Sequence, residues 1–101
     1  MKPLRFVGSS LDDLRSMSAT VRHALGIELM TGEPRDFKPM EAVGAGAYEI
    51  RYRDIHGAFR VIYVARLADA VYVLHAFQKK TQKTPKSDID LAARRYESIG
   101  E

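Results

Sequence analysis

Residues 48–77, YEIRYRDIHGAFRVIYVARLADAVYVLHAF, decide the fold because their pattern is that of a series of strands. The alternating apolar residues at the start are typical of a strand with one buried face. The nearly unbroken apolar run at the end is typical of a central strand, and two short breaks have the composition of turns. The stretch therefore predicts three consecutive antiparallel strands at residues 48–53, 58–67 and 70–77, joined by turns at residues 54–57 and at Ala68-Asp69.

Two amphipathic helices are expected before these strands. Ser10 can cap the first, with Asp13 as its capping-box partner and apolar residues at Leu11, Leu14 and Met17. The second is predicted over residues 18–31, where Val21, Leu25 and Leu29 repeat at a spacing of four before Gly32 and Pro34 end it. Together they predict a helical hairpin.

The remaining segments complete the expected order of elements. Residues 3–7 are predicted to form a first strand, and residues 33–47, which lack a clear period, are interpreted as a loop. After Pro85, Ser87 can cap a last helix whose apolar side holds Ile89, Ala92, Ala93 and Tyr96. The order β-α-α-β-β-β-α indicates an α+β fold, with a helical hairpin packed on an antiparallel sheet and a C-terminal helix.

Composition limits the class of protein. A chain of 101 residues that is 46% apolar and 29% charged is expected to form a single soluble domain over residues 1–101. The sequence has neither an apolar tract long enough for a membrane nor the apolar segment of a signal peptide, and it has no cysteine. We therefore expect a cytoplasmic location without membrane association.

Positive charge is concentrated in one block. Residues 1–50 carry 6 Lys/Arg against 7 Asp/Glu, residues 51–86 carry 8 against 2, and residues 87–101 carry 2 against 4. Such clustering favours an anionic partner such as a nucleic acid, the alternative being an ordinary solvated surface.

The expected register gathers several of these charges on one face of the sheet. If residues 54–57 form the first turn, Arg51 lies opposite Arg60, and the second turn places His75 opposite Ile62 on the face that also carries Arg53. Glu49 is the only acid expected on this strand face. The arginines would then form the floor of a phosphate-binding surface, with the lysines of LHAFQKKTQKTP (residues 74–85) at its rim. Alternatively, each arginine lies along the sheet and holds its charge in solvent.

The order of residues 48–96 resembles the RelE/HigB-type toxins, specifically the phage-derived, HigB-like branch of the RelE/ParE superfamily. The most specific part is the arginine-containing hairpin followed by LHAFQKKTQKTP and a helix. LDDLRSMSATVRHALGIELMTGEPRDFKPM (residues 11–40) is similar to the helical hairpin and following loop of the same branch. The resemblance implies a RelE-like fold, and a type II toxin that acts as a ribosome-dependent mRNA endonuclease. It also implies partners: the ribosome, mRNA and a helix-turn-helix antitoxin of the HigA type.

The same resemblance implies roles for individual residues. Arg60 is similar to the residue that stabilises the transition state, Arg51 to one that positions phosphate, and Lys79 or Lys80 to a basic group after the last strand. With His75 as a candidate for proton transfer, the expected catalytic residues are Arg60, His75, Lys79 and Lys80, and the expected RNA-binding residues are Arg51, Arg53, Lys83 and Lys86. Glu49 stands where RelE has a basic residue.

Several alternatives stay open at this point. His75 can instead be a central-strand residue with a partner in the core. Neither cofactor nor metal is expected, because no suitably spaced second ligand accompanies the histidines. A ParE-like gyrase inhibitor that acts by binding protein, and a phage-derived relic that binds an antitoxin without catalysis, are the rival functions.

Overall fold

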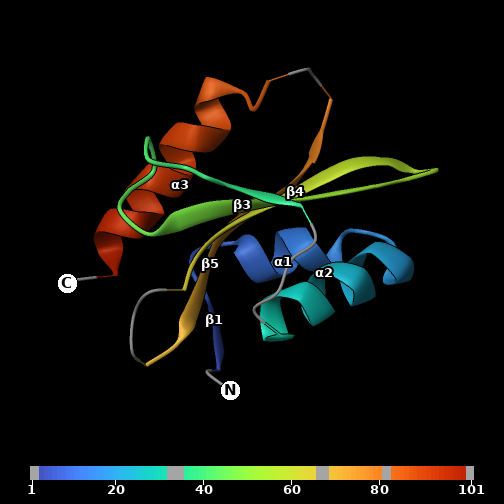
Figure 1. The fold of residues 1–101 in the computed structure, drawn as a ribbon, viewed down its shortest axis with the longest axis horizontal. Helices are drawn as coiled ribbons and strands as arrows, with labels where there is room; N and C mark the ends of the chain where they lie inside the picture. The colour runs from blue at the N-terminus through green and yellow to red at the C-terminus, as the bar shows by residue number, and fades with distance from the viewer. Residues whose placement is uncertain (1–2, 32–35, 66–68, 81–82, 100–101) are drawn as a thin grey trace.

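The computed structural model describes residues 3–31, 36–65, 69–80 and 83–99, and it has one five-stranded sheet with three helices. Figure 1 shows helices α1 and α2 on one side of the sheet and α3 on the opposite side. The elements in chain order are β1 (Leu4–Phe6), α1 (Ser10–Arg15), α2 (Ala19–Thr31), β2 (Phe37–Pro39), β3 (Ala47–Asp54), β4 (Gly57–Val64), β5 (Val71–Lys79) and α3 (Lys86–Ser98). The expected α+β class and helical hairpin are confirmed.

The strands lie in the order β1-β5-β4-β3-β2. The three long strands pair antiparallel as predicted, whereas β1 pairs with β5 in parallel at one edge. Both register predictions are confirmed, since Arg51 lies opposite Arg60 and Ile62 opposite His75. A bulge then shifts the register, so that Tyr63 pairs with Val73. This bulge adds one residue to β5 beside the position of His75.

Three details differ from the sequence-based expectations. The interpretation of residues 33–47 as a loop was wrong at Phe37–Pro39, where β2 pairs with β3; all three residues are exposed, so no alternating pattern marked the strand. Helix α1 has Ser9 at its cap position, because the hydroxyl of Ser10 is buried and donates to the carbonyl oxygen of Val73 at 3.0 Å. Helix α3 has Pro85 at its cap position and starts one residue before Ser87.

The second predicted turn is only partly within the described residues. Strand β4 ends at Val64 and β5 begins at Val71, so the strand expected over residues 58–67 is shorter than predicted. Ala68 lies outside the described residues, whereas Asp69 accepts a hydrogen bond from the Tyr72 hydroxyl at 2.7 Å. The first turn matches the prediction, with Asp54 paired to Gly57.

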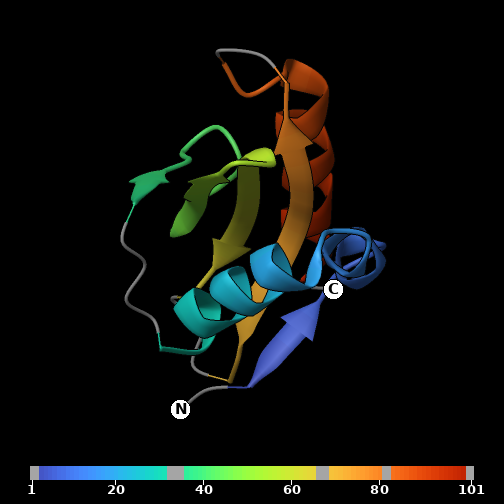
Figure 2. The same cartoon turned by 90° about the vertical axis from the view of Figure 1, so that its right-hand side faces the viewer.

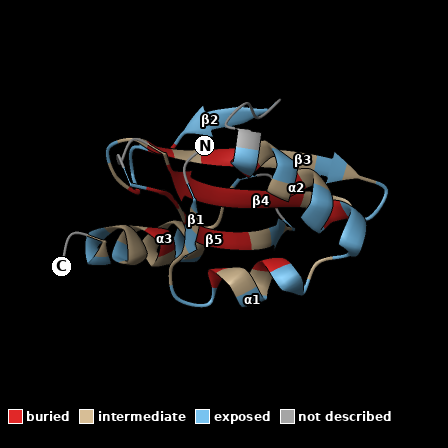
Figure 3. Cartoon of the chain, turned by 90° about the horizontal axis from the view of Figure 1, so that it is seen from below, coloured by how far each residue is buried: buried red, intermediate tan, exposed pale blue. Residues whose placement is uncertain are grey.

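The sheet has a hydrophobic core on each face. Helices α1 and α2 cover one face, where the predicted stripe of Val21, Leu25 and Leu29 is buried against Ile50 and Val61. Figure 2 shows α2 crossing in front of the strands and α3 standing behind them. Figure 3 shows that the buried residues concentrate in the central strands. The sheet is thus a middle layer between α1 and α2 on one face and α3 on the other.

The face under α3 is covered only in part. Its core joins Ile62, Val64 and Leu74 to Ala92 of α3 and to Met40, which precedes β3. The ends of β3 and β4 nearest their connecting turn lie beyond α3, and here the same face carries charged instead of apolar residues. None of the helices in the described part of the chain is long and apolar enough to cross a membrane.

Candidate functional site

Basic side chains line three adjoining hollows on the uncovered part of the α3 face. We call this set the cationic face; it consists of Lys38, Arg51, Arg53, Arg60, Lys79, Lys80 and Lys83. Strand register explains the grouping, because Arg51 lies opposite Arg60, and Arg53 and Lys79 both lie opposite Ala58. Residues opposite one another across paired strands point to the same side of the sheet. Register therefore brings Arg51, Arg53, Arg60 and Lys79 together from three strands.

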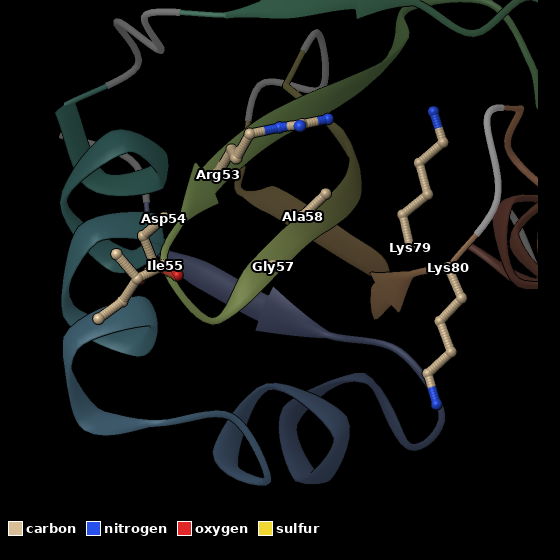
Figure 4. Close-up of a pocket in the computed structure, with 7 residues that line it drawn as sticks. All are labelled: Arg53, Asp54, Ile55, Gly57, Ala58, Lys79 and Lys80. Atoms are coloured by element: carbon tan, nitrogen blue, oxygen red, sulfur yellow. The ribbon is translucent and has the colours of Figure 1, made fainter.

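One of these hollows lies beside the β3–β4 turn. It has a volume of about 560 Å³ and is bordered by Arg53 and by both lysines at the end of β5. Figure 4 shows Arg53 extending over the hollow toward the side of Lys79, while Lys79 and Lys80 point in opposite directions. Consecutive side chains along a strand point to opposite faces of the sheet, which explains why these two lysines diverge. Arg53 and Lys79 therefore face the same space, and Lys80 lies at its margin.

Arg60 lies at the floor of the cationic face. Only 5% of the residue is exposed, and its Nη1 donates to the carbonyl oxygen of Phe59 at 3.0 Å. Its Nε lies 3.6 Å from Oε1 of Glu49, a carboxylate that is completely buried. Burial lowers the pKa of Arg60 from its ordinary value, an effect that Glu49 opposes and the neighbouring arginines reinforce. A buried, paired guanidinium is a rigid group with few alternative positions.

Arg51 also has a carboxylate partner. Its Nε and Nη2 both donate to Oδ1 of Asp36, at 3.1 and 2.8 Å, and its backbone N–H donates to the Asp36 carbonyl. The sequence interpretation counted Glu49 as the only acid on this strand face, with Asp54 just beyond it in the turn, and missed Asp36, which comes from the segment expected to be a loop. Thr84 was missed as well: its hydroxyl donates to Oε2 of Glu49 at 2.7 Å. No periodic signal marked either residue.

The lysines differ in their surroundings. Partial burial and the nearby Arg60 guanidinium lower the pKa of Lys79 from its ordinary value. Lys83 borders a hollow of about 520 Å³ that it shares with Lys38, Arg51 and Lys79. Lys86 is the first residue of α3, its Nζ lies 2.9 Å from Asp90 and its side chain is 88% exposed. Lys79 thus lies close enough to Arg60 for the guanidinium to disfavour its protonated form.

His75 is enclosed between helices α1 and α3. Its Nε2 lies 2.6 Å from Oδ1 of Asp88, its Nδ1 lies 3.9 Å from Asp13, and its ring stacks on Phe77 with the centroids 4.7 Å apart. Only 8% of the side chain is exposed. The histidine therefore shares the strand face with Arg60, but it has a carboxylate partner at the start of α3 and little access to solvent.

The described residues contain no group of three or more His, Cys, Asp or Glu side chains that could hold a metal ion. The cationic face presents guanidinium and ammonium groups. Guanidinium and ammonium groups fixed on a rigid sheet attract phosphate, and they stabilise negative charge that develops on phosphate oxygens.

Fold and site together define a small α+β protein with a cationic sheet face. The chain belongs to the family of phage-derived Gp49-like proteins, whose model matches residues 12–97. Among solved structures, the chain is similar to the E. coli toxin RelE in its free state, studied as a mutant with two arginines replaced by alanine. The TM-score is 0.62 at 20% identity, and 97% of each chain is covered. No curated protein matches the chain significantly.

Proposed function

We propose that this chain is the toxin of a type II toxin-antitoxin system and that it cleaves mRNA on the ribosome without a metal ion. Residues 1–101 would act as one RelE/HigB-like domain. The observation that carries the proposal is the meeting of Arg51, Arg53 and Arg60 with Lys79 on one uncovered sheet face. Membership of a phage-derived family and the RelE-like fold support it.

The cleavage reaction needs a base, an acid and cations that stabilise the phosphate. The 2′-hydroxyl of a ribose attacks the adjacent phosphorus, its proton is accepted by a base, and the bond to the 5′ oxygen breaks as that oxygen takes up a proton. Negative charge grows on the phosphate oxygens in the transition state. Arg60, at the floor beside the hollow of about 260 Å³ that Arg51 and Arg53 also line, is suited to stabilise that charge. Arg51 and Arg53 are suited to hold the flanking phosphates.

Lys79 is our candidate for the group that protonates the 5′ oxygen. Its pKa is lowered by partial burial and by Arg60, which makes its proton easier to transfer than that of an ordinary lysine. Lys80 and Lys83 are proposed to attract the RNA backbone at the margin of the site. The exposed Lys86, which pairs with Asp90, would add only weak long-range attraction.

We propose that His75 holds helix α3 on the sheet and does not transfer a proton. Its short contact with Asp88 joins β5 to the first turn of α3, and its ring stacks on Phe77. His75→Gln separates the two roles. We expect cleavage by this variant to keep its dependence on pH between 5 and 8, while the free energy of unfolding falls. If the pH dependence of cleavage by His75→Gln lacks an ionisation that the wild type shows, His75 takes part in proton transfer.

The partners follow from the proposed function. We propose a HigA-like helix-turn-helix antitoxin as the protein that inhibits this chain, and the ribosome with its mRNA as the cytoplasmic target. Co-purification with the product of the neighbouring reading frame tests the first partner. A neighbouring product without a helix-turn-helix, or one that does not relieve growth arrest, would contradict this assignment.

Controlled expression tests the function directly. Expression of the wild-type chain should stop growth and produce mRNA fragments cut at codon boundaries. The double variant Arg51→Ala/Arg53→Ala should cut at least about 100-fold more slowly, since each residue contacts phosphate in the proposed complex. Arg22→Ala is a matched control, because it removes a charge from the exposed side of α2 and should leave cleavage unchanged. Intact mRNA in arrested wild-type cells would refute the endonuclease.

Two further outcomes identify the rival functions. Arrest with intact mRNA and inhibited supercoiling by purified gyrase would indicate a ParE-like inhibitor. Binding of an antitoxin without arrest would indicate a relic without catalysis. For the metal-independent reaction, EDTA should leave cleavage by purified chain unchanged on ribosomes whose integrity is confirmed by sedimentation. Loss of cleavage on intact ribosomes would mean that a metal ion takes part.

A further inference from the structure

Glu49 is a fully enclosed carboxylate beneath the cationic face. None of its surface is exposed, and its two oxygens face different parts of the site. Oε1 lies 3.6 Å from Nε of Arg60 and 4.0 Å from Nζ of Lys38, whereas Oε2 accepts a hydrogen bond from the hydroxyl of Thr84 at 2.7 Å. One carboxylate therefore contacts strands β2 and β4 as well as the segment that precedes α3.

Stability alone does not account for an acid at this position. Glu49 lies opposite Ile62, and the neighbouring residue on the same sheet face, Ala47, is buried and apolar. Burying an ionised carboxylate carries a desolvation penalty that a pair with one cation often only offsets, and apolar residues of similar volume are commonly as stable. An acid at this position therefore points to a task in the site.

Its geometry limits where the Arg60 guanidinium can lie. Nη1 of Arg60 is held by the Phe59 carbonyl, and Nε is turned toward Glu49. Neither Nε nor Oε1 of Glu49 has a hydrogen-bond partner in the described part of the chain, so charge attraction at 3.6 Å is what joins them. The hollow shared with Arg51 and Arg53 then lies on the remaining side of the guanidinium.

We propose that Glu49 is a positioning residue for the cleavage reaction: it orients Arg60 and, through Thr84, ties the segment that carries Lys83 to the same point. Because Glu49 is enclosed, it acts on RNA only through these neighbours. The inference rests on the proposed function, and a readout that does not depend on cleavage can test it separately.

The first experiment is a double-mutant cycle in single-turnover and steady-state cleavage. Glu49→Gln keeps the shape and an acceptor for Thr84 but removes the charge, and Arg60→Lys keeps a cation beside Glu49 but removes the guanidinium. We expect Glu49→Gln to lower kcat about tenfold with KM within about twofold, and to have no further effect in the Arg60→Lys background. Equal effects in both backgrounds, or an unchanged kcat, would overturn the proposal.

The second experiment observes Arg60 in the folded chain without RNA. Hydrogen exchange at Nε, measured by nitrogen-15 NMR, should be several-fold faster in Glu49→Gln than in the wild type. It should also be faster in Thr84→Val and return to the wild-type rate in Thr84→Ser, which restores the hydroxyl. Glu97→Gln is the matched control, because it makes the same chemical change on the exposed side of α3.

The two experiments fail in different ways. If the wild-type chain does not cleave RNA, the proposed function is wrong, while the exchange rates still report whether Glu49 orients Arg60. If exchange at Nε is the same in wild type and Glu49→Gln, the positioning role is wrong even when cleavage is robust.

Discussion

Removing Arg60 should destabilise the chain strongly, although arginine is usually a surface residue. Arg60 is 5% exposed and its Nε lies 3.6 Å from a carboxylate with no exposed surface. At this distance, two unit charges attract with about 4–5 kcal/mol at an effective dielectric constant of about 20. Arg60→Ala leaves the buried Glu49 with only the Lys38 ammonium, 4.0 Å away on a side chain that is 45% exposed, so we expect the free energy of unfolding to fall by about 3–5 kcal/mol.

Urea unfolding followed by circular dichroism at pH 7 measures this loss. Thermal unfolding should show a fall in Tm of about 12 °C or more. Two variants make the cause specific. Arg53→Ala removes an exposed arginine from the adjacent strand and should change the free energy by less than about 0.5 kcal/mol. The double variant Arg60→Ala/Glu49→Gln should recover at least half of the loss, because no uncompensated charge remains. A loss below about 1 kcal/mol for Arg60→Ala would refute the buried pair.

Three other predictions concern the core, the proton donor and the charge of the site. Leu25→Ala should lower the free energy of unfolding by about 2–5 kcal/mol, because Leu25 has no exposed surface. Ile27→Ala should lower it far less, because Ile27 lies on the same helix but is 47% exposed. Equal losses of the two variants in urea unfolding would contradict the described core. A general acid must be protonated to act, so the rate of cleavage should fall as pH rises through the lowered pKa of Lys79. Lys79→Arg should not show this decrease at alkaline pH. The same pH profile in the wild type and in Lys79→Arg would exclude Lys79 as the proton donor. The affinity for single-stranded RNA should fall with salt, and the slope of log K against log salt concentration should be about −2, as expected for a net charge of three on the cationic face. A slope near −5 would mean that all seven cations bind phosphate and that the neighbouring carboxylates do not offset them.

The sequence predicted the strands that build the site because their pattern is local. Alternation in β3 and the short Asp54–Gly57 turn fix which residues share a face, and these two features were sufficient to pair Arg51 with Arg60. Strand β2 could not be found in this way, since its three residues are exposed and one is a proline. It forms because the edge of β3 offers unpaired backbone groups.

The partners of the arginines were harder to predict than their register. Asp36 reaches Arg51 only because residues 36–39 run beside β3, and Thr84 reaches Glu49 across 35 positions of the chain. Neither contact follows from periodicity. The buried contact of His75 with Asp88 likewise depends on where α3 starts relative to the bulge in β5. Contacts between side chains of separate elements therefore depend on the tertiary structure, whereas the face that these side chains occupy follows from the local sequence pattern.

The carboxylates in the site lower its affinity for RNA and fix the orientation of its arginines. The cationic face has seven basic side chains, and four carboxylates border or underlie it: Asp36, Glu41, Glu49 and Asp54. The balance of three positive charges would give only weak, salt-sensitive binding of free RNA. In return, two of the carboxylates each hold an arginine in one orientation, and fixed donors stabilise a transition state better than mobile ones. A site built this way suits an enzyme whose substrate is already held by something larger, which is the situation of mRNA on a ribosome.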